Sequence, residues 1–322
     1  MKKTILKSGK PIITAQRLII VGQGAIGLLC YHHLNKVTPH LSLLSSKQPY
    51  QSSNVTAAQY IYTGYQQKKA KPYPIAYAQS QEIEQADIVI FCLKSYQINS
   101  AVKSISNKLK LNALLVLAHN GMGTFAEVVK LLPKKQRILA MLTTHGCLRN
   151  SPLTIKHTGL GHSDIGLLSG EMSPNEKSQL NQLLNSAMPT FNFEENIKNK
   201  QWQKLAINCV INPLTALNDI ENGEINSAKF DDITSKLIGE LVVVAQAEGI
   251  ILNEEKLKKT VIEVAKATAK NSSSMRCDVI AKRQTEIDYI NGYIHRLGIK
   301  HCIATPVNTQ IWQAVNTIEA AF

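Results

Sequence analysis

The pattern of apolar residues in this 322-residue chain changes near residue 195. Before that point, short apolar runs of strand length alternate with helical segments. Beyond it, strand signals disappear and helical periodicity dominates. We therefore expect an α/β domain at 17–194 and an all-α domain at 195–322. No Pro-, Gly- or Ser-rich linker separates them, and residues 1–16 are expected to be an N-terminal extension.

The expected elements follow from the same patterns. In the first domain the sequence predicts strands at 17–21, 41–44, 86–94, 113–118, 137–142 and 191–194, and helices at 28–34 and 176–186. The runs 154–157 and 162–168 are expected to form a hairpin. In the second domain, helices are expected at 195–218, 226–248, 254–269, 271–297 and 305–320.

A glycine-rich motif follows the first expected strand. That strand ends in Gly22-Gln23-Gly24-Ala25-Ile26-Gly27, and a helical segment starts directly afterwards. In this position the glycines of G-x-G-x-x-G permit a tight turn and let a pyrophosphate approach the helix N-terminus. The hexapeptide alone is weak evidence, but its context favours a Rossmann-type dinucleotide-binding domain over a chance glycine turn. All six residues are therefore candidate cofactor contacts.

The end of the second expected strand indicates which dinucleotide is bound. A site selective for NAD normally places Asp or Glu there to hold the ribose 2′-hydroxyl. No acidic residue occurs between Gly27 and Glu82, and Ser45, Ser46 and Lys47 stand where that carboxylate would be. Hydroxyls and an ammonium can hold a 2′-phosphate that a carboxylate would repel. We expect NADP (NADPH) as the cofactor, with Ser45 and Lys47 as candidate contacts.

Polar residues follow three further expected strands, at the edge where open α/β sheets bind ligands. Lys94 ends the first of these runs, residues 119–123 follow the second, and residues 143–147 follow the third. Each segment taken alone could also be an ordinary strand exit followed by a turn.

The expected helix around residues 202–213 has a polar stripe. Lys204, Asn208 and Asn212 are spaced at i, i+4 and i+8, so they lie along one face, while apolar residues occupy the rest of the helix. Pro213 should kink or interrupt the helix and present freed carbonyls to a ligand. The alternative is an amphipathic helix with Lys and Asn in water. Since Asn is a poor helix former, we expect the stripe to line a cleft, with Lys204 as candidate general acid.

Three other polar segments of the helical half each admit two interpretations. Asn222 lies in an Asn-Gly turn, which could be only a turn. The serines at 272–274 could cap a helix or help to bind an anion at its N-terminus. Glu286 and Asp288 could be solvated helix charges or residues of a cleft.

Two stretches of the helical half resemble the ketopantoate reductases (2-dehydropantoate 2-reductases), the NADPH enzymes that supply pantoate for vitamin B5 synthesis. Residues 202–217 read Trp-Gln-Lys-Leu-Ala-Ile-Asn-Cys-Val-Ile-Asn-Pro-Leu-Thr-Ala-Leu, and residues 285–292 read Thr-Glu-Ile-Asp-Tyr-Ile-Asn-Gly. The resemblance extends over roughly residues 17–312. These motifs are far more specific than the glycine loop.

The resemblance implies roles for the candidate residues. Those in catalysis would be Lys204, Asn120 and Glu286. Those that contact substrate would be Lys204, Asn120, Asn208, Asn212, Asn222, Ser274, Met275, Arg276 and Cys277, with Ser274 at the carboxylate. Lys94 and Asn120 would flank the nicotinamide, Cys147 would approach the cofactor, and Glu286 would contact the cofactor ribose or orient the substrate. The chain departs from the family at Ser45, where Arg is common, which leaves the 2′-phosphate to Lys47 or the serines.

We therefore expect an NADP-dependent oxidoreductase that acts on a CH–OH group. The expected reaction is the NADPH-dependent reduction of 2-dehydropantoate to pantoate in pantothenate biosynthesis, with Lys204 as general acid. One alternative is another NADP-dependent 2-oxo-acid reductase on the same scaffold. The other is a catalytically silent NADP-binding or redox-sensing protein, since a glycine loop alone indicates only binding.

Composition argues against several other classes. No apolar run approaches the roughly 20 residues of a membrane span. The six cysteines show no C-x-x-C pair, which fits reduced thiols in a cytoplasmic protein, and no ligand spacing indicates a metal site. The net charge of +13 comes without a nucleic-acid module and also suits an anionic cofactor and substrate. We expect a small 2-oxo acid as partner and neither membrane nor nucleic acid; monomer and homodimer remain open.

Overall fold

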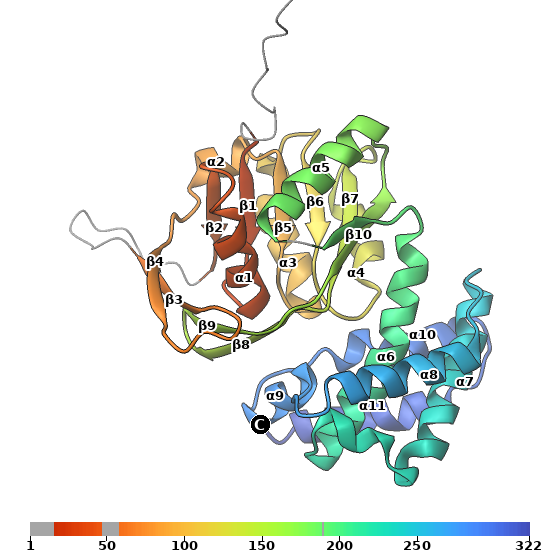
Figure 1. Ribbon diagram of the computed structural model, residues 1–322. Helices are drawn as coiled ribbons and strands as arrows, with labels where there is room; N and C mark the ends of the chain where they lie inside the picture. The colour runs from red at the N-terminus through yellow and green to blue at the C-terminus, as the bar shows by residue number, and fades with distance from the viewer. Residues whose placement is uncertain (1–15, 47–57, 189) are drawn as a thin grey trace, which may run out of the picture. The chain divides into compact units, whose positions relative to one another are not determined.

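The computed structural model describes residues 16–46, 58–188 and 190–322, and they form two compact units (Figure 1). The sheet unit comprises the described residues up to Leu93 together with Gln97–His119 and Val128–Ile197. The helical unit comprises Lys94–Tyr96, Asn120–Glu127 and Lys198–Phe322. An α/β unit and a helical unit confirm the expected fold class.

Seven strands form the main sheet of the sheet unit, in the order β11-β10-β7-β6-β5-β1-β2. Their bounds are β1 Leu18–Val21, β2 Leu41–Leu44, β5 Ile88–Phe91, β6 Leu114–Leu117, β7 Arg137–Thr143, β10 Ser163–Ser169 and β11 Phe191–Phe193. The strands from β7 to β2 in that order run parallel, β10 is antiparallel to β7, and β11 is parallel to β10. β1, β5 and β6 are buried along their whole length, as their near-continuous apolar runs predict.

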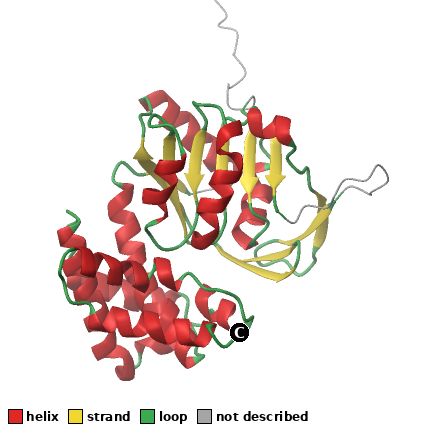
Figure 2. Cartoon of the chain, turned by 180° about the vertical axis from the view of Figure 1, so that it is seen from behind, coloured by secondary structure: helices red, strands yellow, loops and turns green. Residues whose placement is uncertain are grey.

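Helices lie against both faces of this sheet (Figures 1 and 2). They are α1 Ala25–Leu34, α2 Ser80–Glu84, α3 Ser95–Ile105 and α5 Pro174–Ala187, with 3₁₀ turns η2 Ser106–Lys108 and η3 Val129–Leu131. A further short helix, α4 Thr124–Val128, begins in the helical unit. α5 starts with a capping box, in which Ser173 accepts from the Glu176 backbone N–H and Glu176 reaches back to Ser173.

A second sheet of four strands, in the order β4-β3-β9-β8, adds to the expected architecture. Its strands are β3 Gln59–Thr63, β4 Lys71–Pro74, β8 Gly146–Ser151 and β9 Thr154–Gly159. The expected hairpin of 154–157 with 162–168 is wrong, because β9 pairs with β8 and β3, whereas β10 pairs with β7 and β11. Local patterns predicted the two strands but not their partners, since each also pairs with a strand distant in sequence.

The helical unit contains α6 Ile197–Asn218, which starts in the sheet unit, and five later helices around one apolar core (Figure 2). The later helices are α7 Asp231–Ala247, α8 Glu254–Ala267, α9 Ser274–Ile280, α10 Asn291–Lys300 and α11 Pro306–Glu319, with 3₁₀ turns η4 Asn222–Asn226, η5 Ala228–Phe230 and η6 Ile287–Tyr289. The expected single helix at 271–297 is wrong: α9 stops at Ile280, Lys282 adopts a positive φ of 49°, and α10 starts only at Asn291. None of the described helices is long and apolar enough to cross a membrane.

Helix α6 continues through Pro213, so the expected interruption is wrong. Proline has no N–H, and the Cys209 carbonyl therefore loses its donor from one turn later. The Asn291 side chain replaces that donor, with Nδ2 at 3.0 Å from the Cys209 oxygen, and it also donates to Asn308 Oδ1 at 3.0 Å. Asn291 is completely buried. The freed carbonyl is thus bonded inside the unit and does not await a ligand.

Four histidines of the sheet unit form a cluster, which we call the histidine cluster: His32 and His33 on α1, His145 after β7, and His157 on β9. His33 is half-buried and the other three are buried. The Gly161 N–H donates to His145 Nδ1 at 3.2 Å, so this nitrogen carries no proton. His157 Nε2 lies 3.3 Å from the same atom and must be the donor of that pair. His145 is therefore built into the unit as a neutral imidazole.

Burial lowers the pKa values of this cluster. The pKa falls to about 3 at His32 and to about 4 at His33 and His145, and it is also lowered at His157. Lys36 and the neighbouring imidazoles add to the effect at His32 and His33, because a second positive charge nearby disfavours protonation. The unfolded chain thus binds more protons than the folded one below about pH 6.5.

We expect this cluster to make the sheet unit sensitive to acid. The stability that the neutral imidazoles contribute is fully present above about pH 6.5 and is lost as pH falls towards about 4, where the folded groups begin to bind protons. His145→Asn keeps an acceptor for Gly161 and removes one titrating group. It should make the slope of unfolding free energy against pH shallower by about 1 kcal/mol per pH unit. Urea unfolding at pH 7, 6, 5 and 4 measures this slope, and His40→Asn, at an exposed position, is the control. Equal slopes of unfolding free energy against pH for His145→Asn and wild type would contradict the expectation.

Candidate active site

The glycine motif forms a tight turn between β1 and α1. Gly22 has a φ of +110°, and a Cβ there would lie 2.5 Å from the Cys92 carbonyl oxygen. A Cβ at Gly27 would lie 2.0 Å from the Gly22 oxygen. At Gly24, in contrast, an added Cβ meets nothing nearer than 4.0 Å. The turn thus leaves open space in front of the α1 N-terminus, and this fits the close approach of a pyrophosphate.

Other expected cofactor residues of the sheet unit gather around this turn. The Tyr77 hydroxyl donates to Gln23 Oε1 at 3.4 Å, and the Cys147 thiol donates to the Ala25 oxygen at 3.4 Å. Burial raises the pKa of Cys147 to about 12, so it stays a thiol. Ala25 and Ile26 begin α1, and Ser45 follows the end of β2, where the Gly22 N–H donates to the Leu44 oxygen. Lys47 lies outside the described residues.

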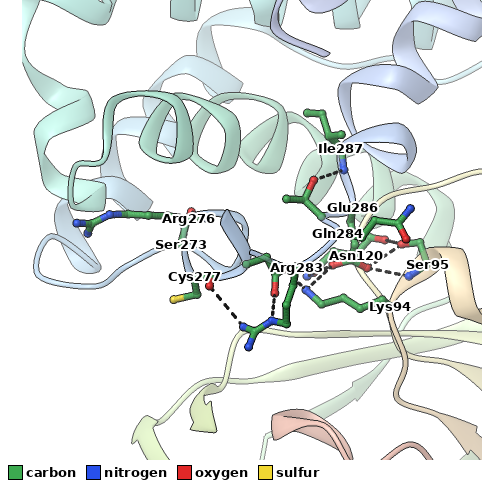
Figure 3. A network of polar contacts seen from close by, with 12 residues as sticks. Lys94, Ser95, Asn120, Ser273, Arg276, Cys277, Arg283, Gln284, Glu286 and Ile287 are labelled. Atoms are coloured by element: carbon green, nitrogen blue, oxygen red, sulfur yellow. Dashed lines mark hydrogen bonds and ion pairs between the residues drawn. The ribbon is translucent and has the colours of Figure 1, made fainter. Parts of the chain in front are cut away.

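A buried carboxylate organises the polar residues of the helical unit (Figure 3). Glu286 is 4% exposed, and its Oε1 accepts from the Ser95 N–H at 3.0 Å and from Ser95 Oγ at 2.8 Å. Its Oε2 accepts from Asn120 Nδ2 at 3.3 Å and from Lys94 Nζ at 3.5 Å. The alternative of a solvated charge is therefore wrong for Glu286. A buried carboxylate needs such donors, because its desolvation is costly.

The same contacts keep two short segments in the helical unit. Ser95 Oγ also lies within hydrogen-bond distance of the Asn120 backbone oxygen, so its single proton is shared between this oxygen and Glu286, and the contact joins Lys94–Tyr96 to Asn120–Glu127. The Met122 N–H donates to the Tyr289 oxygen at 2.7 Å, and Gly121, with a φ of +76°, leaves no room there for a Cβ. The helical unit thus holds Lys94, Asn120 and Glu286 in one network.

A second carboxylate, Asp278 on α9, also binds Lys94. Asp278 Oδ2 lies 2.5 Å from Lys94 Nζ, and Asp278 Oδ1 lies 3.2 Å from Arg283 Nε. Burial lowers the pKa of Lys94, but the charges of Glu286 and Asp278 outweigh it and raise the pKa above its usual value. Lys94 is therefore an ammonium at neutral pH.

Sequence reasoning did not single out Ser95 or Asp278. Asp278 had a usable signal, because it is the only acidic residue between Glu263 and Glu286. Ser95 had none beyond its position after Lys94, since its contacts to Glu286 span 191 positions of the chain.

The polar stripe lies on α6 as the helical spacing predicts. Lys204 and Asn208 are half-buried and Asn212 is 7% exposed. One turn further, Thr215 Oγ1 donates to Ser273 Oγ at 2.7 Å, which ties α6 to the start of α9. Ser273 is the N-cap that accepts from the Arg276 N–H at 3.1 Å.

The remaining substrate candidates surround this junction. Ser274 is the exposed first residue of α9, Met275 is buried, and Arg276 Nε lies 2.8 Å from Asp219 Oδ1. Cys277 is half-buried. The Asn222 N–H donates to the Asn271 oxygen at 3.0 Å, and its Nδ2 donates to Thr268 Oγ1 at 3.0 Å. Its Oδ1 is buried without a protein partner, which leaves one acceptor available.

Comparison with known proteins gives the family. A model described as "Ketopantoate reductase PanE/ApbA" matches residues 18–170, and its C-terminal counterpart matches residues 196–319. The chain belongs to the ketopantoate reductase family. A 2-dehydropantoate 2-reductase of Vibrio cholerae is 32% identical over 306 residues, covering 95% of this chain and 98% of that protein. One from Shigella flexneri is 36% identical over 237 residues, covering 74% and 76%.

Solved structures agree on the fold of this ketopantoate reductase family member. A PanE/ApbA family ketopantoate reductase from Ralstonia eutropha JMP134 has a TM-score of 0.81 at 24% identity, covering 95% of this chain and 99% of that one. A D-mandelate dehydrogenase solved with NADH and anilino(oxo)acetate has a TM-score of 0.84 at 22% identity, with the same coverage. With the family, the chain is an oxidoreductase acting on a CH–OH group. Within the described part of the chain, no three His, Cys, Asp or Glu residues are grouped so that they could hold a metal ion.

Glu286→Gln should destabilise the helical unit. The amide nitrogen of Gln replaces one acceptor oxygen and faces donors, so at least one buried donor loses its partner. We expect the free energy of unfolding to fall by about 2–4 kcal/mol, measured by urea unfolding. Glu255→Gln on α8, whose side chain is 85% exposed, is the matched control and should stay within about 0.5 kcal/mol of wild type. A similarly small change for Glu286→Gln would show that the network contributes little.

Proposed function

We propose that this chain reduces 2-dehydropantoate to pantoate with NADPH, as a step of pantothenate biosynthesis. The observation that supports this most strongly is the match of both family models, at 18–170 and 196–319, the second of which includes the stripe on α6. Relatives from Vibrio cholerae and Shigella flexneri are named for this reaction. In the proposal, residues 17–194 bind the cofactor and residues 195–322 bind the substrate.

The cofactor assignment rests on the glycine turn and on Lys47, the positive charge that follows β2 in the sequence. Gly22 to Gly27 would hold the pyrophosphate, with Gln23, Ala25, Ile26 and Cys147 lining the turn. Ser45 and Lys47 would hold the 2′-phosphate, which favours NADPH over NADH. When bound, the nicotinamide supplies the hydride that reduces the ketone carbon. Lys94 and Asn120 would lie beside it.

The ketone oxygen needs a proton to become a hydroxyl, and Lys204 is proposed as its source. Its ammonium would polarise the carbonyl and then donate the proton. Asn208 and Asn212, one and two turns later on α6, would hold the substrate in the matching orientation. Because the general acid and these amides share one helix, their spacing is fixed by the helix itself.

The substrate's other groups would be held around the start of α9. Ser274 would bind the carboxylate, with Met275, Arg276 and Cys277 lining the pocket. Asn222 would accept from a substrate hydroxyl, because its Oδ1 is buried and has no protein partner. Glu286 already accepts from Lys94, Ser95 and Asn120. We therefore propose that it acts by holding Lys94 and Asn120 in place.

The decisive assay follows the absorbance of the reduced cofactor with 2-dehydropantoate. We expect rapid oxidation of NADPH and slower oxidation of NADH, because no carboxylate stands where the ribose 2′-hydroxyl would be held. Benzoylformate and other 2-oxo acids belong in the panel, since a D-mandelate dehydrogenase shares the fold. Faster turnover of another 2-oxo acid would identify a different reductase on this scaffold. Binding of NADPH without turnover of any of them would contradict the proposed activity.

Lys204→Ala should lower turnover by roughly 10²- to 10⁴-fold, the range for a positioned general acid. The substitution leaves the apolar face of α6 intact, so circular dichroism and the thermal midpoint should stay close to wild type. Lys198→Ala, at an exposed position near the start of the same helix, is the matched control and should keep full turnover. Near-normal turnover of a folded Lys204→Ala variant would remove Lys204 from the reaction.

A further inference from the structure

Lys94 is held by two carboxylates that differ in what else they bind. Both oxygens of Glu286 already accept from Ser95 and Asn120, and its contact to Lys94 Nζ is the longer one, at 3.5 Å. Asp278 gives one oxygen to Lys94 at 2.5 Å and the other to Arg283 at 3.2 Å. Asp278 is 4% exposed, whereas the Lys94 side chain is 31% exposed, so the carboxylate of this pair is buried and the ammonium is half-buried. Asp278 is therefore the nearer partner of the ammonium, and its charge acts together with that of Glu286.

We propose that Asp278 is a positioning residue for dinucleotide binding, which acts through Lys94 by keeping its ammonium charged and in one place. The inference rests on the proposed function, in which Lys94 contacts the cofactor. The dinucleotide is an anion, and a cation that binds it must stay protonated and ordered.

The position of Asp278 on α9 gives the pair a second consequence. Ser274 and Asp278 are four residues apart on this helix and lie on the same face. The ion pair with Lys94 therefore fixes the rotation of α9 about its own axis. This rotation sets the position of Ser274, the residue proposed to hold the substrate carboxylate. Asp278 would thus align the cofactor lysine and the substrate serine together.

The groups that face Lys94 decide how its charge responds to pH. Asp278, Glu286 and the Tyr96 hydroxyl face Lys94, and Arg283 binds the other oxygen of Asp278. Burial opposes the charge on Lys94, and the two carboxylates overcome this effect. Without Asp278, Lys94 would lose the nearer carboxylate and keep Glu286 at 3.5 Å, so the pKa of Lys94 should fall. A residue that served stability alone would not change the titration of cofactor binding.

The test measures the NADPH dissociation constant by fluorescence between pH 7.5 and pH 10 on the full chain. We expect the affinity of wild type to change little over this range, and that of Asp278→Asn to weaken by about tenfold as Lys94 loses its proton. Arg283→Gln is the control: it removes the other ion pair of the same carboxylate and should keep the wild-type profile. In a Lys94→Met background, adding Asp278→Asn should change the affinity less than about twofold.

If the NADPH affinities of wild type and Asp278→Asn depend on pH in the same way, the proposal is overturned. It is also overturned if Asp278→Asn lowers the affinity as much in the Lys94→Met background as it does when Lys94 is present. If Asp278→Asn does not fold, the proposal can still be tested in wild type. NMR of isotopically labelled lysines then follows the titration of Lys94. The Lys94 signal, assigned from its loss in Lys94→Met, should titrate above the ordinary lysine pKa, and a value at or below it contradicts the proposal. Since NADPH binding is measured without substrate, failure of the ketopantoate assay remains a separate result.

Discussion

The helical unit depends on the burial of one carboxylate. Glu286 is removed from water, and a buried charge of this kind is tolerated only when donors surround it. Its donors come from two segments that lie more than 160 positions earlier in the chain, at Ser95 and Asn120. These contacts join Lys94–Tyr96 and Asn120–Glu127 to the helical unit, although the residues around them belong to the sheet unit. Lys94 and Asn120 are thus ordered by an electrostatic requirement, whereas Lys204, Asn208 and Asn212 are ordered by the helix that carries them.

The sequence predicted those parts of the fold that depend on local patterns. The strand at 41–44 and the glycine turn follow from short runs whose burial and backbone geometry are set within a few residues. The second sheet was missed, although one of its strands was expected at 154–157, because its two hairpins, β3 with β4 and β8 with β9, are joined only through the pairing of β3 with the distant β9. The break between α9 and α10 was missed as well, since the segment around Glu286 leaves the helical path to reach Ser95 and Asn120.

The residues of the candidate site also differ in whether local sequence patterns predict them. The spacing of Lys204, Asn208 and Asn212 could be read directly, because one helix carries all three. The importance of Glu286 required resemblance to a family, and Ser95 and Asp278 required coordinates. A side chain whose partner lies nearly 200 residues away leaves no mark in local periodicity. An aspartate alone in a basic segment, such as Asp278, is the kind of weak signal that could be searched for.

The pairing of Pro213 with Asn291 implies a direction in the history of this helix. A carbonyl oxygen has two lone pairs, so the Cys209 oxygen could accept from Asn291 even when residue 213 still had its N–H. Proline at 213 without asparagine at 291 would instead leave that oxygen buried and unbonded. Acquiring Asn291 before Pro213 therefore keeps the Cys209 oxygen bonded throughout, whereas the reverse order passes through a chain in which this oxygen is buried and unbonded. Once both are present, replacing Asn291 removes the donor on which the Cys209 oxygen depends.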